Sequence, residues 1–266
     1  MHSIETEYDY IIVGSGSAGS VVANRLSADK NVSVLVLEAG GPDTNFWLKL
    51  PVGYFRTIYD ERFSRIFKTE PSEGDGHRGI DWPRGKVVGG SSSINGLIYI
   101  RGQQEGFNDW ADLGANGWAF KDVLPHFKTL ENCKTGVPEY RGRLGEMSVS
   151  NLRNDHPCCQ AWMDAAEQFG LPKNPDFNGE SNYGVGPYQL TLAGRWRASA
   201  ARCFLYPALK RSNLHIQTNA LATRVTFDGN KANGVEWLQR GKLVKARATQ
   251  EVILCGGALQ LSLIHI

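Results

Sequence analysis

The sequence predicts an α/β protein whose first domain is a Rossmann-like, nucleotide-binding domain. Two observations predict this class. A glycine-rich turn joins an apolar strand to a helix near the N-terminus, and short apolar segments typical of strands recur after residue 210. The 266 residues are 41% hydrophobic and 21% charged, which is a globular composition and excludes an intrinsically disordered chain.

Charge and cysteine content narrow the class further. The net charge of +2 is too balanced for a dedicated nucleic-acid-binding protein, so we expect no nucleic-acid partner. The five cysteines form no CxxC pair and no metal-ligand spacing, and their odd number indicates reduced thiols in an intracellular protein. No basic leader precedes Tyr8 and no run of about 18 apolar residues occurs. We therefore expect a soluble, cytoplasmic protein without a metal site or a membrane span.

The first elements form a strand–turn–helix–strand unit of about 30 residues. Its parts are, in order, residues 8–13, 14–19, 18–28 and 32–37. β-Branched and aromatic residues predict two buried strands of a parallel sheet, and Ala, Val and Leu at helical spacing predict the helix. The second strand ends at Glu38, 19 positions after the last glycine of the turn.

The turn has the G-x-G-x-x-G spacing of dinucleotide sites, and each glycine has a physical role. Gly14 permits the tight turn, Gly16 lets the backbone approach a pyrophosphate, and Gly19 lets the helix pack close to the sheet. The helix N-terminus supplies free N–H groups and partial positive charge. The Glu38 carboxylate is expected to accept hydrogen bonds from both ribose hydroxyls and to repel a 2′-phosphate, which disfavours NADP. Further expected contacts are Ser15, Ser17, Ala18 and Ala39.

A second glycine-rich segment, WPRGKVVGGSSSINGLIYIRG, occupies residues 82–102. Gly89 and Gly90 remove side chains where backbone could lie against a flat or phosphorylated ligand. The side chains of Ser91, Ser92 and Asn95 add hydrogen-bonding groups. A plain surface loop is the alternative, but it does not explain the apolar residues that alternate with the glycines.

The remaining segments predict two helices with apolar faces and a series of strands. The helices are expected at residues 120–130 and 157–169. The strands are expected at 97–100, 146–150, 185–191, 214–218, 222–227, 232–239, 243–248 and 251–255. The helix over 157–169 is expected to bury one face, formed by Cys158, Trp162, Ala165 and Phe169.

The second glycine-rich segment resembles the first signature of the glucose–methanol–choline (GMC) flavin oxidoreductases, in their choline-dehydrogenase-like branch. The matching positions are Gly85, Lys86, Val88, Gly89, Gly90, Ser91, Ser92, Ile94, Asn95, Tyr99, Gly102 and Asn108. Further similar motifs, such as Asp109-Trp110, Gly117-Trp118 and Phe177-Asn178-Gly179, extend the resemblance to about residue 260. The resemblance implies a Rossmann-like FAD-binding domain joined to an α+β substrate-binding domain, here truncated.

The resemblance also implies a helix at 197–209, which returns the chain to the FAD-binding domain, and it implies the domain limits. The FAD-binding domain is expected at 1–155 and 195–260, the start of the substrate-binding domain at 156–194, and an atypical tail at 261–266. The chain has about half the usual family length, so the family's catalytic His is expected beyond residue 266. No catalytic residue is predicted within the chain, and we expect this fragment alone to be inactive.

The implied activity is FAD-dependent oxidation of choline or another primary alcohol to the aldehyde, with hydride transfer to flavin N5. Oxygen or a quinone is the implied electron acceptor, and the full-length protein is expected to form a homo-oligomer. Ile94 stands where some relatives carry a flavin-linked His, so we expect non-covalent FAD. By resemblance the FAD contacts also include Val88, Gly89, Gly90, Ser91, Ser92, Asn95, Gly96 and, at the adenine, the backbone of Val225.

Two alternatives remain open. Tyr206 and Lys210 fit the Tyr-x-x-x-Lys pattern of short-chain NAD-dependent dehydrogenases, in which the Lys lowers the pKa of a catalytic Tyr. A redox-silent flavoprotein or a lyase on the same scaffold is the other alternative, because a fold does not determine a function. Flavin absorbance during alcohol addition distinguishes the latter, since a lyase leaves the flavin oxidised.

Overall fold

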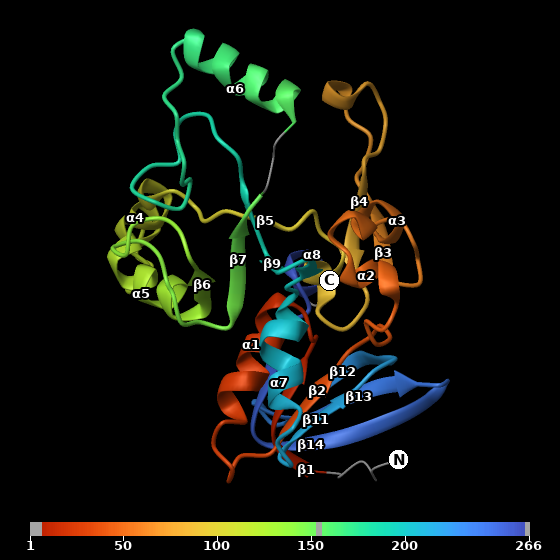
Figure 1. Cartoon of the computed structure of the whole chain (residues 1–266). Coiled ribbons are helices and arrows are strands. Elements are labelled where there is room, and N and C mark those ends of the chain that lie inside the picture. Colours follow the sequence, from red (N-terminus) through yellow and green to blue (C-terminus); the bar gives the residue numbers. More distant parts are fainter. Residues whose placement is uncertain (1–6, 153–155, 264–266) are drawn as a thin grey trace. The chain divides into compact units, whose positions relative to one another are not determined.

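The computed structural model describes residues 7–152 and 156–263. The chain divides into two compact units (Figure 1). Unit 1 comprises Met1–Gly96 and Ser199–Ile266, and unit 2 comprises Leu97–Ala198. The substrate-binding domain was expected to begin at residue 156. Unit 2 begins earlier, because residues 97–155 cluster with residues 156–198.

Unit 1 is built on a six-stranded mixed sheet with the order β11-β2-β1-β14-β13-β12. The first four strands in this order run parallel, and β13 and β12 continue the sheet with antiparallel pairing. The strands are β1 (Glu7–Val13), β2 (Val34–Leu37), β11 (Leu214–Gln217), β12 (Ala220–Asp228), β13 (Lys231–Gln239) and β14 (Lys242–Leu254). The predicted α/β class and the strand–turn–helix–strand unit at the N-terminus are confirmed.

Short helices and one hairpin complete unit 1. The helices are α1 (Ser17–Leu26), α2 (Phe46–Lys49), α3 (Tyr54–Thr57), α7 (Tyr206–Ala208) and α8 (Ala258–Leu263). The short 3-10 and π segments are η1 (Pro51–Gly53), η2 (Glu73–Asp75), η3 (Gly90–Ser93) and η4 (Ala201–Leu205). The hairpin joins β3 (Ser64–Lys68) to β4 (Asp81–Gly85) in antiparallel register.

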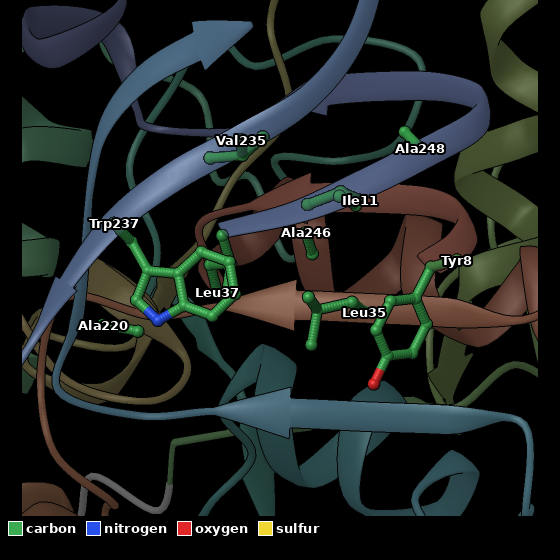
Figure 2. Packing of buried hydrophobic residues seen from close by; sticks show 9 residues of the cluster. All are labelled: Tyr8, Ile11, Leu35, Leu37, Ala220, Val235, Trp237, Ala246 and Ala248. Carbon is green, nitrogen blue, oxygen red and sulfur yellow. The ribbon is translucent and has the colours of Figure 1, made fainter. Parts of the chain in front are cut away.

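Apolar residues cover both faces of the sheet. All four residues of β2 are buried, and successive residues point to opposite faces. On one face Leu35 and Leu37 pack with Tyr8, Ile11 and Trp237, together with small residues of β12 and β14 (Figure 2). On the other face Val34 and Val36 pack against residues of α1 and of the helical segment over 200–209.

Residues 242–254 form one long strand, although the sequence predicts two strands at 243–248 and 251–255. β14 pairs antiparallel with β13 up to Arg247 and parallel with β1 from the same residue onward. The register with β1 shifts between Tyr8 and Tyr10, which accommodates the polar residues Thr249 and Gln250 without ending the strand. The predicted interruption is therefore a register shift.

The helix predicted at 197–209 begins later and contains a π turn. Trp196 and Arg197 form β10, which pairs with β9 across a turn at Gly194 (φ +64°). The helical segment follows, with the π turn at Ala201–Leu205 and then α7. The predicted start at 197 is wrong, because residues 196 and 197 pair with β9 in a hairpin.

Unit 2 contains a four-stranded sheet with the order β5-β8-β7-β6. Its strands are β5 (Ile98–Tyr99), β6 (Glu131–Cys133), β7 (Met147–Asn151) and β8 (Gln189–Leu190), and the separate hairpin is β9 (Leu192–Ala193) with β10 (Trp196–Arg197). Its helices are α4 (Gln104–Asp112), α5 (Phe120–Leu130) and α6 (Pro157–Gln168). Pro125 lies inside α5 without ending it, so the predicted helix at 120–130 is confirmed.

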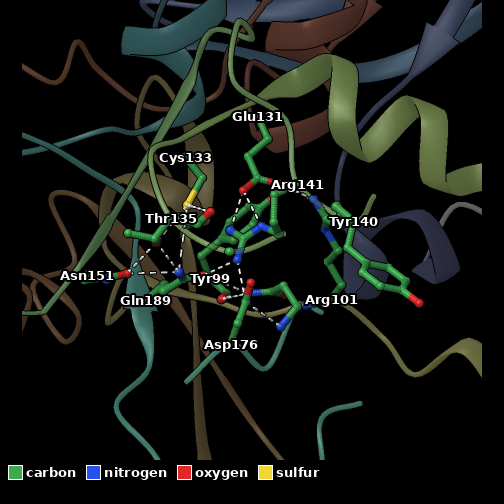
Figure 3. Close-up of polar contacts among 12 residues, drawn as sticks. Tyr99, Arg101, Glu131, Cys133, Thr135, Tyr140, Arg141, Asn151, Asp176 and Gln189 are labelled. Atoms are coloured by element: carbon green, nitrogen blue, oxygen red, sulfur yellow. Dashed lines mark hydrogen bonds and ion pairs between the residues drawn. The ribbon is translucent and has the colours of Figure 1, made fainter. Parts of the chain in front are cut away.

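A buried network of charged side chains holds unit 2 together (Figure 3). Glu131 accepts hydrogen bonds from Arg101 and Arg141, and both arginines are buried. Arg141 Nη1 also donates to Asp176 Oδ1 and to Gln189 Oε1, both at 2.5 Å. The network joins segments that are far apart in the sequence.

The predicted buried face of α6 is wrong. Within the described residues α6 contains no buried position, and 67% of Trp162 and 89% of Phe169 are exposed. The periodicity correctly predicted the helix, with Pro157 at its first position, but apolar spacing does not say whether another element covers the face.

None of the helices in the described ranges has the length and apolar character needed to cross a membrane.

Candidate functional site: a cavity at the carboxyl ends of the strands

Unit 1 contains a cavity of about 480 Å³ at the carboxyl ends of β1, β2 and β14. This is the edge at which open α/β sheets bind their ligands. The cavity is bounded by the glycine-rich turn after β1, by residues 37–39 at the end of β2, and by residues 254–261 after β14. Further walls come from residues 84–86, 90–91 and 220–222 and from Arg65.

The three glycines of the turn meet different surroundings. Gly14 has φ +101°, and a Cβ there would lie 2.5 Å from the carbonyl oxygen of Cys255. A Cβ on Gly19 would lie 1.9 Å from the carbonyl oxygen of Gly14, so α1 can approach the sheet only with glycine at this position. Gly16 borders the cavity, and a Cβ there would meet only the Cα of Gly90, at 3.7 Å. Gly14 and Gly19 therefore serve the fold, and Gly16 keeps space open in the cavity.

The N-terminus of α1 faces the cavity. Gly16 is the N-cap residue, and among the described residues its helix receives no side-chain cap. Ser17 and Ala18, the first residues of the helix, line the cavity. Free backbone N–H groups and the positive end of the helix dipole at this place favour a negatively charged ligand group.

Glu38 is buried at the end of β2 and is held by backbone and side-chain donors. Its Oε2 accepts from the N–H (3.0 Å) and the hydroxyl (2.6 Å) of Ser15, and its Oε1 accepts from the N–H of Gly40 (2.8 Å). A carboxylate offers about four acceptor positions. Three of them are filled here, which leaves room for one ribose hydroxyl, whereas the sequence suggested that Glu38 accepts from both.

The second glycine-rich segment lies against the first. Gly89 (φ +90°) donates to the carbonyl oxygen of Ser15 at 3.1 Å, and a Cβ on Gly90 would lie 2.8 Å from the Cα of Gly16. Ser92 and Ser93 donate their hydroxyls to backbone carbonyls of the same segment. These two serines stabilise the turn, and Gly90 and Ser91 border the cavity together with residues 84–86 of the same segment.

The structure places half of the predicted contact residues at the cavity. Those that line it are Gly14, Gly16, Ser17, Ala18, Glu38, Ala39, Gly90 and Ser91. Among the described residues, those that do not line it are Ser15, Gly19, Val88, Gly89, Ser92, Asn95, Gly96 and Val225. Val225 pairs with Val235 in the antiparallel part of the sheet, and residues 220–222 of the same strand border the cavity instead.

Several lining residues were missed by the sequence analysis. Arg84 and Lys86 belong to the second glycine-rich segment, and Arg65 comes from the partner strand of the hairpin. The positive charges of the PRGK sequence at residues 83–86 could have indicated Arg84 and Lys86, whereas nothing in the sequence indicates Arg65. Cys255 also borders the cavity, and burial raises the pKa of its thiol.

The described histidines lie elsewhere. His156 caps α6 by accepting from the N–H of Cys158 (3.2 Å), and the Nδ1 of His215 lies 3.2 Å from the hydroxyl of Tyr8. None of the histidines in the described ranges lines the cavity, and no group of three His, Cys, Asp or Glu residues there could hold a metal ion. His2 and His265 lie outside the described residues.

Tyr206 does not have the environment of a catalytic tyrosine. Burial and the hydrogen bond that it donates to the Asp43 carboxylate raise the pKa of the Tyr206 hydroxyl. A Tyr-x-x-x-Lys site requires a neighbouring lysine to lower this pKa. The geometry therefore argues against the short-chain dehydrogenase alternative.

Known proteins share this fold and sequence. The GMC oxidoreductase family matches residues 8–264. The mitochondrial choline dehydrogenase of Mus musculus is 40% identical over 260 residues, which cover 95% of this chain and 44% of that protein. The alcohol dehydrogenase (acceptor) of Pseudomonas putida is 42% identical over 255 residues, with coverage of 95% and 46%.

Pyridoxine 4-oxidase from Mesorbium loti is a solved structure with the same arrangement. It superimposes with a TM-score of 0.91 at 30% identity and covers 96% of this chain and 50% of its own. The chain thus spans about half the length of the relatives it matches. The predicted fold class and the predicted family are confirmed, and the chain belongs to the GMC oxidoreductase family.

Proposed function

We propose that the whole protein oxidises choline or a related primary alcohol to the aldehyde, with FAD as its cofactor. One observation carries the proposal: the family match over residues 8–264 coincides with a cavity bounded by the parts of a dinucleotide site. Relatives named choline dehydrogenase and alcohol dehydrogenase support the alcohol as the substrate class.

The residues of the cavity fit a dinucleotide. Its volume of about 480 Å³ is in the range of cofactor sites. The position of Gly16 leaves space that a Cβ would fill, and the N-terminus of α1 faces the same space. Glu38 supplies one carboxylate acceptor for a ribose hydroxyl.

The chain's own residues bind and orient the cofactor in this proposal. The turn at Gly14–Gly19 and the N-terminus of α1 bind the diphosphate, and Glu38 binds the adenosine ribose. Residues 220–222, which border the cavity, lie on the same strand as Val225, the residue that the resemblance implies at the adenine. FAD, when bound, supplies the redox chemistry by accepting a hydride from the alcohol carbon. We assign no proton-transfer role to the cavity residues, since the described lining includes no histidine.

We propose that the FAD is held without a covalent bond. Ile94, which stands where some relatives carry a flavin-linked His, is buried with Leu48 and Val87 in an apolar cluster. An isoleucine side chain offers no nucleophile. Precipitation in denaturant should therefore leave the flavin in the supernatant, and colour retained in the washed pellet would contradict this part of the proposal.

The experiment that tests the function has two measurements. The first is FAD binding by residues 1–266, followed by flavin absorbance and fluorescence. The second is anaerobic addition of choline or a simple primary alcohol to the full-length protein with FAD bound. We expect loss of the oxidised flavin spectrum. A flavin that stays oxidised with every alcohol would favour the redox-silent flavoprotein or lyase and overturn the proposal.

Three further features belong to the same proposal. The electron acceptor is oxygen or a quinone. Adding each of them to the alcohol-reduced protein and following the return of the oxidised flavin spectrum shows which one reoxidises the flavin. A cytoplasmic location is supported by the five cysteines of this chain, all of which are free thiols, and is tested by cell fractionation. Homo-oligomer formation by the full-length protein is tested by light scattering during size-exclusion chromatography.

A further inference from the structure

Two arginines of the β3–β4 hairpin stand opposite each other at the wall of the cavity. Arg65 of β3 pairs directly with Arg84 of β4, and both residues line the cavity. Residues that are directly opposite on antiparallel strands project from the same face with their Cβ atoms about 5 Å apart, and like charges in such a pair are destabilising. The hairpin therefore carries an unfavourable contact unless a negative charge lies near both side chains.

Neither guanidinium has a carboxylate partner among the described residues. The Nη1 of Arg65 lies 3.1 Å from the side-chain amide of Gln260, in the amide orientation that satisfies both groups. Arg84 donates to the carbonyl oxygen of Pro83 (3.1 Å), and its guanidinium lies 4.5 Å from the ring centre of Trp82. All of these partners are neutral, so no negative charge among the described residues compensates the two positive charges.

The charges around the cavity leave an excess that matches a diphosphate. The charged lining residues are Arg65, Arg84, Lys86 and Glu38, so three cations and one carboxylate give a formal charge of +2. The diphosphate that links the two halves of a dinucleotide carries one negative charge on each phosphate. Arginine is suited to this partner, because its planar guanidinium can donate two parallel hydrogen bonds to one phosphate.

We propose that Arg65 and Arg84 form an anion subsite that binds the diphosphate group of the cofactor. This inference rests on the proposed function, because the diphosphate is that of FAD. The sequence motif places the diphosphate at the backbone of the Gly14–Gly19 turn. The hairpin adds side-chain charge from another part of the lining of the same cavity, and ligand binding relieves the repulsion between the two arginines.

The test measures binding to residues 1–266 by calorimetric titration with FAD, adenosine and inorganic pyrophosphate. Arg65→Gln and Arg84→Gln should each weaken the affinity for FAD and for pyrophosphate about tenfold, since each removes charge-assisted hydrogen bonds. Adenosine, which has no phosphate, should bind within twofold of the original affinity. The matched control is Arg240→Gln, which removes the same charge at an exposed turn outside the cavity lining and should change none of the three.

A melting experiment separates ligand binding from a structural role. Without ligand, Arg65→Gln and Arg84→Gln should melt at or above the temperature of the unaltered chain, because the like-charge contact is removed. Arg65→Lys and Arg84→Lys keep the charge and should recover part of the affinity. Lower melting temperatures in both Gln variants would assign the arginines to the fold and overturn the subsite.

The outcomes distinguish the two proposals. If the chain binds FAD and both Gln variants bind FAD and pyrophosphate equally well, the subsite is overturned and the cofactor assignment stands. If pyrophosphate binds through the two arginines but FAD does not bind, the subsite is supported and the proposed function is contradicted.

Discussion

Ser15 donates two hydrogen bonds to one oxygen of Glu38, from its backbone N–H at 3.0 Å and its hydroxyl at 2.6 Å. The contact joins the turn after β1 to the end of β2. The N–H of Gly40 donates to the second oxygen at 2.8 Å. The residue that the sequence marks as a ribose ligand is therefore also the acceptor that holds the turn in place.

Glu38→Ala should therefore cost both stability and cofactor affinity. The substitution leaves the buried donors of Ser15 and Gly40 without an acceptor, and we expect the free energy of unfolding of the ligand-free chain to fall by about 2–3 kcal/mol. FAD affinity should fall by about 1.5–3 kcal/mol. Urea unfolding and FAD titration measure the two effects. Ser15→Ala removes a single hydrogen bond and should cost about 1 kcal/mol; a Glu38→Ala chain as stable as the original would refute the structural role.

Two glycines three residues apart should respond differently to the same substitution. Gly16→Ala adds a methyl group toward the cavity, where only Gly90 lies within contact distance, and the φ of −71° at Gly16 is one that alanine adopts freely. We expect a change in the free energy of unfolding of less than about 1 kcal/mol but strongly reduced FAD binding. Gly19→Ala places its methyl group 1.9 Å from the carbonyl oxygen of Gly14, so we expect a loss of about 3 kcal/mol or more.

Thermal unfolding and FAD titration of the two variants check this difference. A Gly16→Ala chain that binds FAD as tightly as the original would mean that the diphosphate does not approach this residue. A stable Gly19→Ala chain would mean that α1 can move away from the sheet.

The buried network of unit 2 gives a third prediction. Arg141→Met removes the guanidinium that bridges Glu131 and Asp176, and it leaves Asp176 without its ion-pair partner. Breaking a buried ion pair by removing one partner costs about 3–5 kcal/mol. We expect unit 2 to unfold at lower denaturant concentration, as followed by tryptophan fluorescence. Lys173→Met removes an exposed ion pair with Glu167 and serves as the control, with an expected cost below about 1 kcal/mol.

The sequence predicted the nucleotide-binding half because its signals are local. The positive φ of Gly14 and the close contact of Gly19 are properties of a few consecutive residues, and the Glu38 position follows from the length of one strand–helix–strand unit. The same holds for α5 and for the first turn of α6, where Pro157 occupies the position that suits it.

The sequence could not predict features that depend on register or on tertiary cover. Arg65 and Arg84 are 19 positions apart, and only the antiparallel register of the hairpin brings them together. Likewise the position of residues 220–222 rather than Val225 at the cavity depends on where β12 begins. The exposure of Trp162 could not be predicted, because an apolar stripe marks a face and not its partner.

Asp9 gives a prediction of pH dependence. Its Oδ2 accepts from the N–H and the hydroxyl of Ser33, and its Oδ1 accepts from the hydroxyl of Thr249, each at 2.8 Å. The backbone hydrogen bond from Ser33, followed by the two hydroxyl hydrogen bonds, lowers the pKa of Asp9 from its ordinary value of 3.8. These contacts tie β1 to the start of β2 and to the register shift in β14, and they stabilise the sheet more strongly while Asp9 is charged.

The direction of the effect follows from the lowered pKa. A carboxyl group whose pKa is lower in the folded state stabilises the fold fully above its unfolded-state pKa, and this stabilisation is lost as the pH falls through the folded-state pKa. Asp9→Asn should therefore be less stable than the original chain near pH 7, and the difference should shrink as the pH is lowered below about 4. Urea unfolding of both chains across this range measures the difference directly. Asp228→Asn, at an exposed position at the end of β12, is the matched control and should show a much smaller difference. A gap between the Asp9→Asn and original chains that stays constant down to the lowest measurable pH would show that the Asp9 contacts do not depend on its charge.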